Sequence, residues 1–183
     1  MGYSTEFTGT IAVTPPLNAE EIEYLRLFAA TRHVERHRGP YYVDGQYGHG
    51  DNHDVINDST PSAGQPGLWC QWVATSGGAG IEGGGEDGFS NAHAWMQYII
   101  DHFLRPGGHA KGMPGFEAFT FDHTLNGSLV AQGDDLRDEW QLDVDDNTAL
   151  VFGLTAADAD VKDAELLALP VEDLLRIIDE YGP

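Results

Sequence analysis

Two imidazoles and two carboxylates lie within six residues of one another, at His49, Asp51, His53 and Asp54. Imidazole nitrogens and carboxylate oxygens bind zinc and related divalent metals, so this segment would form a metal site if it folded back on itself. Such a site would point to a metal-dependent hydrolase. The spacing matches no zinc motif, however, and Asp, Asn, Gly and His are also common turn residues. A divalent-metal site and a solvated loop are therefore both compatible with the sequence.

A cluster of basic residues forms the second candidate site. Four of the nine Lys and Arg residues lie in the thirteen positions from Arg26 to Arg38. A helix is predicted just before the densest part of this cluster, and cations at a helix C-terminus are stabilised by the helix dipole. Alternatively, Arg32, Arg36 and Arg38 would contact an anion or the acidic surface of a partner. The sequence does not decide between these two roles.

Other chemical motifs are incomplete. Gly78–Gly83 fits the G-x-G-x-x-G pattern of dinucleotide sites, but the next predicted helix starts too late to hold a pyrophosphate. The segment from Asp143 begins like a calcium loop, yet it lacks the Gly and Glu that an EF-hand requires. Cys70 is the only cysteine, and its apolar neighbours predict a buried side chain rather than a nucleophile. The sequence identifies no catalytic residue and no organic cofactor.

The chain is strongly acidic, with 30 Asp and Glu residues, 9 Lys and Arg residues and a formal net charge of -21. Binding to DNA, RNA or an anionic membrane requires clustered cations, so this balance argues against direct contact with any of them. It favours an acidic surface that binds a protein partner with a basic surface, or that imitates nucleic acid. A GC-rich genome or a high-salt host would give the same composition without a role in binding.

The chain of 183 residues is long enough for one domain with a hydrophobic core. We expect an α+β domain over residues 1–153 and an acidic, helical C-terminal extension over residues 154–183. No apolar run approaches the roughly 20 residues of a membrane-spanning helix, and the first residues show no signal-peptide pattern. These features predict a cytoplasmic location, or a place in the virion if the protein is structural.

Local patterns predict the elements that position the candidate residues. Residues 6–13 alternate as a strand, and Asn18 with Glu21 forms a capping box that opens a helix ending near His33. Residues 39–67 lack periodicity and are predicted to be a long loop. Loops of that length are uncommon inside a compact domain unless they are functional or mobile.

The second half of the domain should complete the sheet. After a strand around Trp72 and a short return strand at Ile81, a helix starts with Ser90 as its N-cap. The dipeptide at 126–127, Asn-Gly, predicts a tight hairpin that joins a strand over 117–125 to the next one. Two further strands complete a mainly antiparallel sheet, with the two helices packed on one face.

Several short motifs resemble a known family. They are the strings GLWCQWV at Gly67–Val73 and FTFDH at Phe119–His123, followed by Asn126–Gly127 and by AQGDD at Ala131–Asp135. They are similar to signatures in a family of short uncharacterised proteins from actinobacterial and other bacterial genomes and their phages. The resemblance covers roughly residues 1–150 and implies a phage or bacterial accessory protein, with no catalytic residues assigned.

The combined expectation is a non-enzymatic, acidic interaction protein, encoded by a phage or virus, that binds a basic protein partner. One alternative is a virion or assembly component of a virus whose host has a GC-rich genome or lives in high salt. The other is a metal-dependent hydrolase that uses the loop from His49 to Asp54.

Overall fold

The computed structural model describes residues 5–43, 53–85, 89–133, 135 and 138–153. In chain order the elements are β1 (Thr5–Gly9), β2 (Ile11–Thr14), α1 (Ala19–Ala30), β3 (Val34–Arg36), β4 (Val55–Pro61), β5 (Trp72–Ala74), β6 (Gly80–Gly83), α2 (Ala92–Ile99), the π-helix η1 (Ile100–Leu104), β7 (Thr124–Gly133), β8 (Glu139–Asp145) and β9 (Thr148–Gly153). None of the helices in these ranges is long and apolar enough to cross a membrane. The expected helical extension over residues 154–183 lies outside the described residues.

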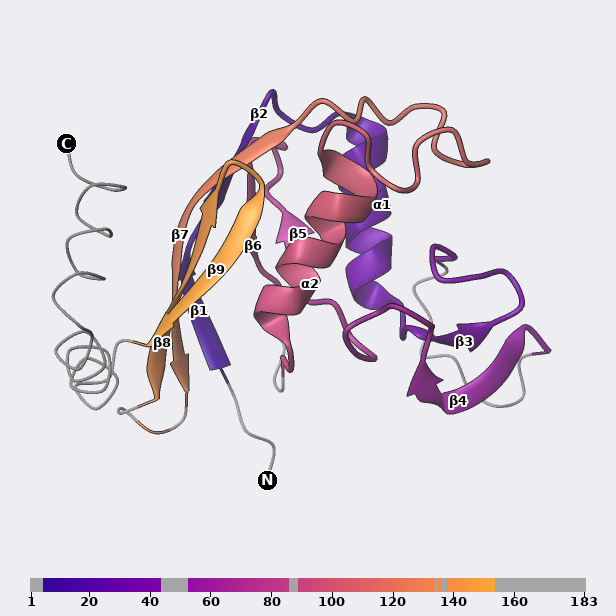
Figure 1. Ribbon diagram of the computed structural model, residues 1–183, viewed down its shortest axis with the longest axis horizontal. Coiled ribbons are helices and arrows are strands. Elements are labelled where there is room, and N and C mark those ends of the chain that lie inside the picture. The colour runs from indigo at the N-terminus through magenta and orange to yellow at the C-terminus, as the bar shows by residue number, and fades with distance from the viewer. Residues whose placement is uncertain (1–4, 44–52, 86–88, 134, 136–137, 154–183) are drawn as a thin grey trace, which may run out of the picture.

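Seven strands form one antiparallel sheet in the order β5-β6-β2-β7-β8-β9, and β1 also pairs with β7. β3 and β4 form a separate two-stranded sheet at the far end of α1 (Figure 1). Both long helices lie on the same side of the large sheet (Figure 1). The predicted mixed α and β fold, with a mostly antiparallel sheet and two helices, is confirmed.

Helix α1 begins where the capping box predicts. The Asn18 side chain accepts a hydrogen bond from the Glu21 N–H at 3.0 Å, and the Glu21 carboxylate accepts one from the Asn18 N–H at 2.8 Å. Two orphan donors of the first turn are thereby satisfied. Leu25 and Phe28 lie on the apolar face of the helix and are completely buried. The helix ends at Ala30, a few residues before the predicted boundary near His33.

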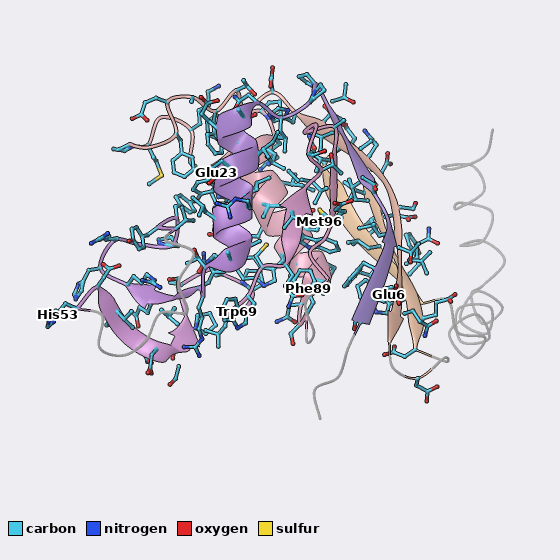
Figure 2. All side chains as sticks on the ribbon, turned by 180° about the vertical axis from the view of Figure 1, so that it is seen from behind. Glu6, Glu23, His53, Trp69, Phe89 and Met96 are labelled. Carbon is cyan, nitrogen blue, oxygen red and sulfur yellow. The ribbon has the colours of Figure 1, made fainter. Side chains whose placement is uncertain are left out.

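Helix α2 starts one residue later than predicted, because Asn91 rather than Ser90 precedes its first turn. Its apolar face carries Trp95, Met96 and Ile99, which are fully buried against the sheet and α1. Figure 2 shows Met96 enclosed between the helices and the strands. The core around them is dense in aromatic rings, which pack edge to face as their quadrupoles favour.

The predicted loop over residues 39–67 is partly wrong. Val55–Pro61 forms β4, which pairs with β3 through bulged registers at Glu35 and Arg36. The basic cluster therefore lies mostly on and around a strand, and the last turn of α1 contains no basic residue. The helix-dipole interpretation of that cluster is also wrong, because the chain has left the helix before Arg32.

The predicted hairpin at Asn126–Gly127 is wrong as well, since both residues lie inside the continuous strand β7. Gly127 has a φ of 141° and faces the break between β1 and β2, where a Cβ atom would lie 3.1 Å from the Thr10 carbonyl oxygen. Glycine is needed there for close backbone approach rather than for a turn. Residues 117–123, predicted as the partner strand, form turns and irregular backbone instead.

Candidate functional site

The two sites expected from the sequence share one carboxylate. Asp54 lies 3.6 Å from Nη1 of Arg36 and 3.6 Å from Nε of Arg38, and the Arg38 backbone N–H also donates to it at 3.1 Å. The side chains of Arg36 and Asp54 are 2% and 8% exposed, whereas that of Arg38 is 60% exposed. The predicted metal ligand Asp54 is therefore a counter-ion of two predicted anion-contact residues.

An aromatic ring completes this cluster. The guanidinium groups of Arg36 and Arg38 lie 5.4 and 4.5 Å from the centre of the Tyr42 ring, within the range of cation–π attraction. The carbonyl of Arg32, the third predicted contact residue, accepts a hydrogen bond from Nη2 of Arg36 at 3.5 Å. The positive charge of this region is thus partly neutralised from within, which leaves Arg38 as its most exposed cation.

The other predicted metal ligands are not assembled around Asp54 in the described residues. His53 is exposed at the outer corner of the β3–β4 sheet (Figure 2), and His49 and Asp51 lie outside the described residues. Within the ranges that the structure describes, no group of three His, Cys, Asp or Glu side chains could hold a metal ion. To bind a metal, Asp54 would have to exchange its contacts with two arginines for the ion.

A buried polar cluster joins the start of α1 to the segment before β7. Nε2 of His123 lies 3.2 Å from Oε2 of Glu21 and 3.0 Å from Oγ1 of Thr120. Nδ1 of His123 donates to the Pro15 carbonyl at 2.7 Å. The Glu21 carboxylate also accepts the backbone N–H and hydroxyl hydrogens of Thr120, at 2.8 and 3.1 Å.

The electrostatics of this cluster favour an ion pair. Burial raises the pKa of Glu21, but the hydrogen bonds from His123, Thr120 and Asn18 outweigh it and lower the pKa to about 2. Burial lowers the pKa of His123, yet the Glu21 carboxylate and the Pro15 carbonyl raise it above its ordinary value. With both ring nitrogens donating, His123 has no lone pair with which to accept a proton as a general base. The cluster therefore stabilises the fold and does not resemble a catalytic triad.

Helix α2 widens into a π-helix at its C-terminal end, and such turns are frequent at functional sites. It carries His102, whose Nδ1 accepts a hydrogen bond from the Tyr41 hydroxyl and whose ring stacks on Tyr98 with centroids 3.8 Å apart. Burial, and then the charge of the neighbouring His109, lower the pKa of His102 to about 4. The neutral ring therefore serves as a hydrogen-bond acceptor for Tyr41 at pH 7.

The groove beside Tyr41 offers little for catalysis. It has a volume of about 430 Å³, and its lining combines aromatic residues, small residues and one cation: Tyr24, Tyr41, Tyr42, Phe116, Met113 and Arg38, with glycine, proline and valine between them. Among the described residues, the lining contains no carboxylate, imidazole or thiol. Cys70 lies elsewhere in the core, where complete burial raises the pKa of its thiol to about 12. It is a buried apolar residue, as its sequence neighbours predict.

The face of the sheet that points away from the helices has a different character. The strand registers place Glu6, Glu139, Asp143 and Asp145 on this outer face, and the opposite face carries the buried Leu129, Leu142 and Val144. Three large apolar side chains are exposed among the carboxylates: Val130, Leu150 and Phe152, at 36%, 44% and 37%. In the described chain, none of the seven strands of this sheet contains a Lys, Arg or His.

The four arginines between positions 26 and 38 lie away from this face, in a region that also carries Glu20, Glu23, Glu35 and Asp58. Arg26, Arg32, Arg36 and Arg38 lie on and after α1, while the strands on the other side of the molecule carry only acidic groups. In Figure 2, Glu6 lies on the large sheet and His53 lies at the opposite end of the molecule. An acidic face with exposed apolar side chains can attract and bury a cationic surface.

The backbone of β9 lies at one edge of the described sheet. β9 is the terminal strand of the described sheet, and one of its edge groups is satisfied by α2: the Gln97 side chain accepts from the Ala149 N–H at 2.8 Å. The strand contains no Lys or Pro, two of the residue types that protect exposed edges in other proteins.

Comparison with known proteins gives no relatives: no family model, no curated protein and no solved structure matches this chain.

Sequence reasoning missed the two features that define these sites. Asp54 contacts Arg36, and Tyr41 contacts His102. These residues are far apart in the chain, so no local spacing in the sequence predicts the contacts. The acidic outer face could have been found from the strand alternation over 139–145, where acidic residues occupy every second position except 141.

Proposed function

We propose that this chain is a non-enzymatic interaction protein that binds a protein partner with a basic surface through the outer face of its sheet. The observation that carries the proposal is the convergence of Glu6, Glu139, Asp143 and Asp145 on one face that also exposes apolar side chains. Carboxylates steer a cationic partner and set its orientation, and apolar contacts contribute affinity once water is displaced.

The resemblance to bacterial and phage proteins extends the proposal. An accessory protein encoded by a phage or bacterium would meet its partner in the host cytoplasm, or in the virion if it is an assembly component. The metal-dependent hydrolase is the weaker alternative, because Asp54 already contacts Arg36 and Arg38. The described lining of the groove beside Tyr41 contains no carboxylate or imidazole.

The test compares two variants with the same change in net charge. In the first, Glu139→Gln, Asp143→Asn and Asp145→Asn neutralise the outer face. In the matched control, exposed carboxylates elsewhere are neutralised by Glu20→Gln, Glu35→Gln and Asp58→Asn. Each protein is titrated, at low and moderate salt, against small folded proteins of matched size whose net charges run from negative to positive.

We expect binding only to the positively charged probes, with affinity that weakens as salt rises and screens the charges. Neutralising the outer face should weaken binding at least about tenfold, roughly 1.4 kcal/mol, and the control variant should bind nearly as well as the natural chain. Equal loss in both variants would show that only net charge matters. Absence of binding to any cationic probe would refute the proposal.

A further inference from the structure

We infer that the partner binds by strand addition: an extended segment with alternating basic and apolar residues pairs with the edge of β9 that no other strand of the described residues covers. This inference rests on the proposed function and specifies its geometry. It follows from the position of β9 at the end of the sheet, from the hydrogen-bonding phase of the β8–β9 hairpin and from the distribution of charge around it.

The hairpin turn determines which backbone groups of β9 point away from β8. Asp146 and Asn147 form a two-residue turn with φ values of 42° and 69°, so the flanking pair Asp145–Thr148 is hydrogen-bonded. Hydrogen-bonded and non-hydrogen-bonded pairs alternate from there, which makes Leu142–Val151 a non-hydrogen-bonded pair. The N–H and C=O of Val151 therefore point away from β8. The Ala149 N–H points the same way, and its bond to Gln97 supports this phase.

The open edge is short and apolar. It runs from the Ala149 carbonyl to Gly153, with Val151 at its centre and 45% exposed. The side chain of Val151 lies on the helix side of the sheet, whereas Leu150 lies on the outer face beside Asp143. An added strand would place alternate side chains on these two faces. Apolar side chains would contact Val151, and cationic side chains would reach the carboxylates of the outer face.

Two acidic segments could also pair with this edge: a second copy of the chain, and residues 154–183. Electrostatic repulsion disfavours both relative to a basic segment. A second copy of the chain carries a net charge of -21, so edge-to-edge pairing would bring like charges together. Residues 154–183, which follow β9 directly, contain eight acidic and two basic residues and would also be repelled by the outer-face carboxylates. A cationic segment is attracted by the same groups.

The inference is tested with a capped eight-residue peptide that alternates Lys and Val, and with two N-methylated derivatives of it that are isomers of each other. One isomer is N-methylated at every Val and the other at every Lys. All have the same charge, and the two isomers have the same mass, so electrostatic binding alone cannot distinguish the isomers. In an antiparallel addition, the residue opposite Val151 shares its face and exchanges both hydrogen bonds with it. The valine N–H groups then face β9.

We expect the valine-methylated isomer to bind at least tenfold more weakly than the lysine-methylated isomer and the unmethylated peptide. Loss confined to the lysine-methylated isomer would show parallel strand addition and would also support the inference. If both isomers bind like the unmethylated peptide, strand addition is wrong although the proposed function stands. If the unmethylated peptide does not bind while folded cationic proteins do, strand addition is again wrong. If neither binds, both proposals fail.

A substitution at the edge provides the complementary test in the full chain. Val151→Pro removes the outward N–H without removing a hydrogen bond to β8, and proline is tolerated at edge positions whose N–H faces solvent. Val151→Thr keeps the N–H and the β-branched shape. We expect Val151→Pro to weaken peptide binding at least tenfold and Val151→Thr to change it little, with circular dichroism confirming that both fold. If Val151→Pro misfolds, protection of the Val151 amide from hydrogen exchange on adding peptide to the natural chain decides the question. Unchanged binding to folded Val151→Pro, or a natural-chain dimer that Val151→Pro dissociates, would overturn the inference.

Discussion

Nε2 of His123 lies 3.2 Å from Oε2 of Glu21, and both side chains are almost completely enclosed by protein. Glu21 belongs to the first turn of α1, and His123 lies just before β7. The contact therefore links the helix layer to the central strand of the sheet. Its charges are balanced by hydrogen bonds on every side, which is the condition under which a buried pair can be retained.

Removing one partner of this pair should be costly. We expect His123→Leu to reduce the free energy of unfolding by about 3–5 kcal/mol, because it leaves the Glu21 carboxylate buried without a counter-ion. In a double-mutant cycle, Glu21→Gln combined with His123→Leu should cost less than the sum of the single changes. Glu23→Gln is the control, since its salt bridge to Arg26 is exposed and should not matter measurably. Strict additivity, measured by denaturant unfolding, would show that the pair is not coupled.

The pair should also contribute in a defined pH window. The folded-state pKa of Glu21 is about 2, below its ordinary value of 4.5, so its contribution is lost as pH falls from 4.5 towards 2. The pKa of His123 is raised, so its contribution is complete below about pH 6.5 and is lost as pH rises through the folded-state value. The destabilisation caused by His123→Leu should therefore be largest between about pH 4.5 and 6.5.

His33 should make the fold sensitive to acid. Its Nε2 donates to the Phe28 carbonyl at 2.9 Å, and burial, together with the charge of Arg36, lowers its pKa to about 3. In the unfolded chain His33 binds a proton near pH 6.5, whereas in the folded chain it binds one only near pH 3. The free energy of unfolding therefore falls as pH drops from 6.5 towards 3. His33→Gln should flatten the dependence of Tm on pH in this range. Equal slopes in the natural chain and His33→Gln would contradict the assignment.

Asp54 should act as a structural counter-ion. Asp54→Asn leaves the buried guanidinium of Arg36 with less compensation and should lower the free energy of unfolding by about 2–4 kcal/mol. Adding zinc should not raise Tm, because a ligand stabilises a protein only when it binds the folded state in preference to the unfolded state. Elemental analysis of the purified protein can contradict this prediction. About one metal per chain that disappears after His49→Ala with His53→Ala would restore the metal-dependent hydrolase.

The sequence predicts elements whose determinants are local. The capping box needs only Asn18 and Glu21, three residues apart, and the apolar stripe of α2 repeats within two turns. By contrast, Val55–Pro61 forms β4 because it pairs with β3, which lies well before it in the chain. The polar sequence of β4 shows no strand pattern by itself. The same distinction applies to the sites: the acidic face follows from alternation along β8, while the Asp54 cluster depends on tertiary contacts.

The misplaced hairpin shows how a local signal can be overridden. Asn-Gly is the strongest two-residue hairpin signal, yet the type I′ geometry occurs at Asp146–Asn147, where both φ values are positive. Asn126 contributes to that turn from the neighbouring strand, because its Oδ1 accepts from the Asp146 N–H at 2.9 Å. Glycine at position 127 is required by the close approach of the Thr10 carbonyl oxygen. Both residues serve nonlocal contacts that a single sequence does not reveal.

The turn at Asn147 provides a direct measure of these contacts. Its Oδ1 accepts from the Leu125 N–H at 2.8 Å, its Nδ2 donates to the His123 carbonyl at 3.1 Å, and its backbone is left-handed. Asn147→Ala should lower the free energy of unfolding by about 2–3 kcal/mol, since it removes two hydrogen bonds and places alanine at positive φ. Asn147→Gly removes the same hydrogen bonds without that strain and should be less destabilising than alanine. If glycine is as stable as asparagine, the side-chain contacts to β7 contribute nothing. If Asn147→Ala is as stable as Asn147→Gly, the positive φ at this position imposes no measurable strain on alanine.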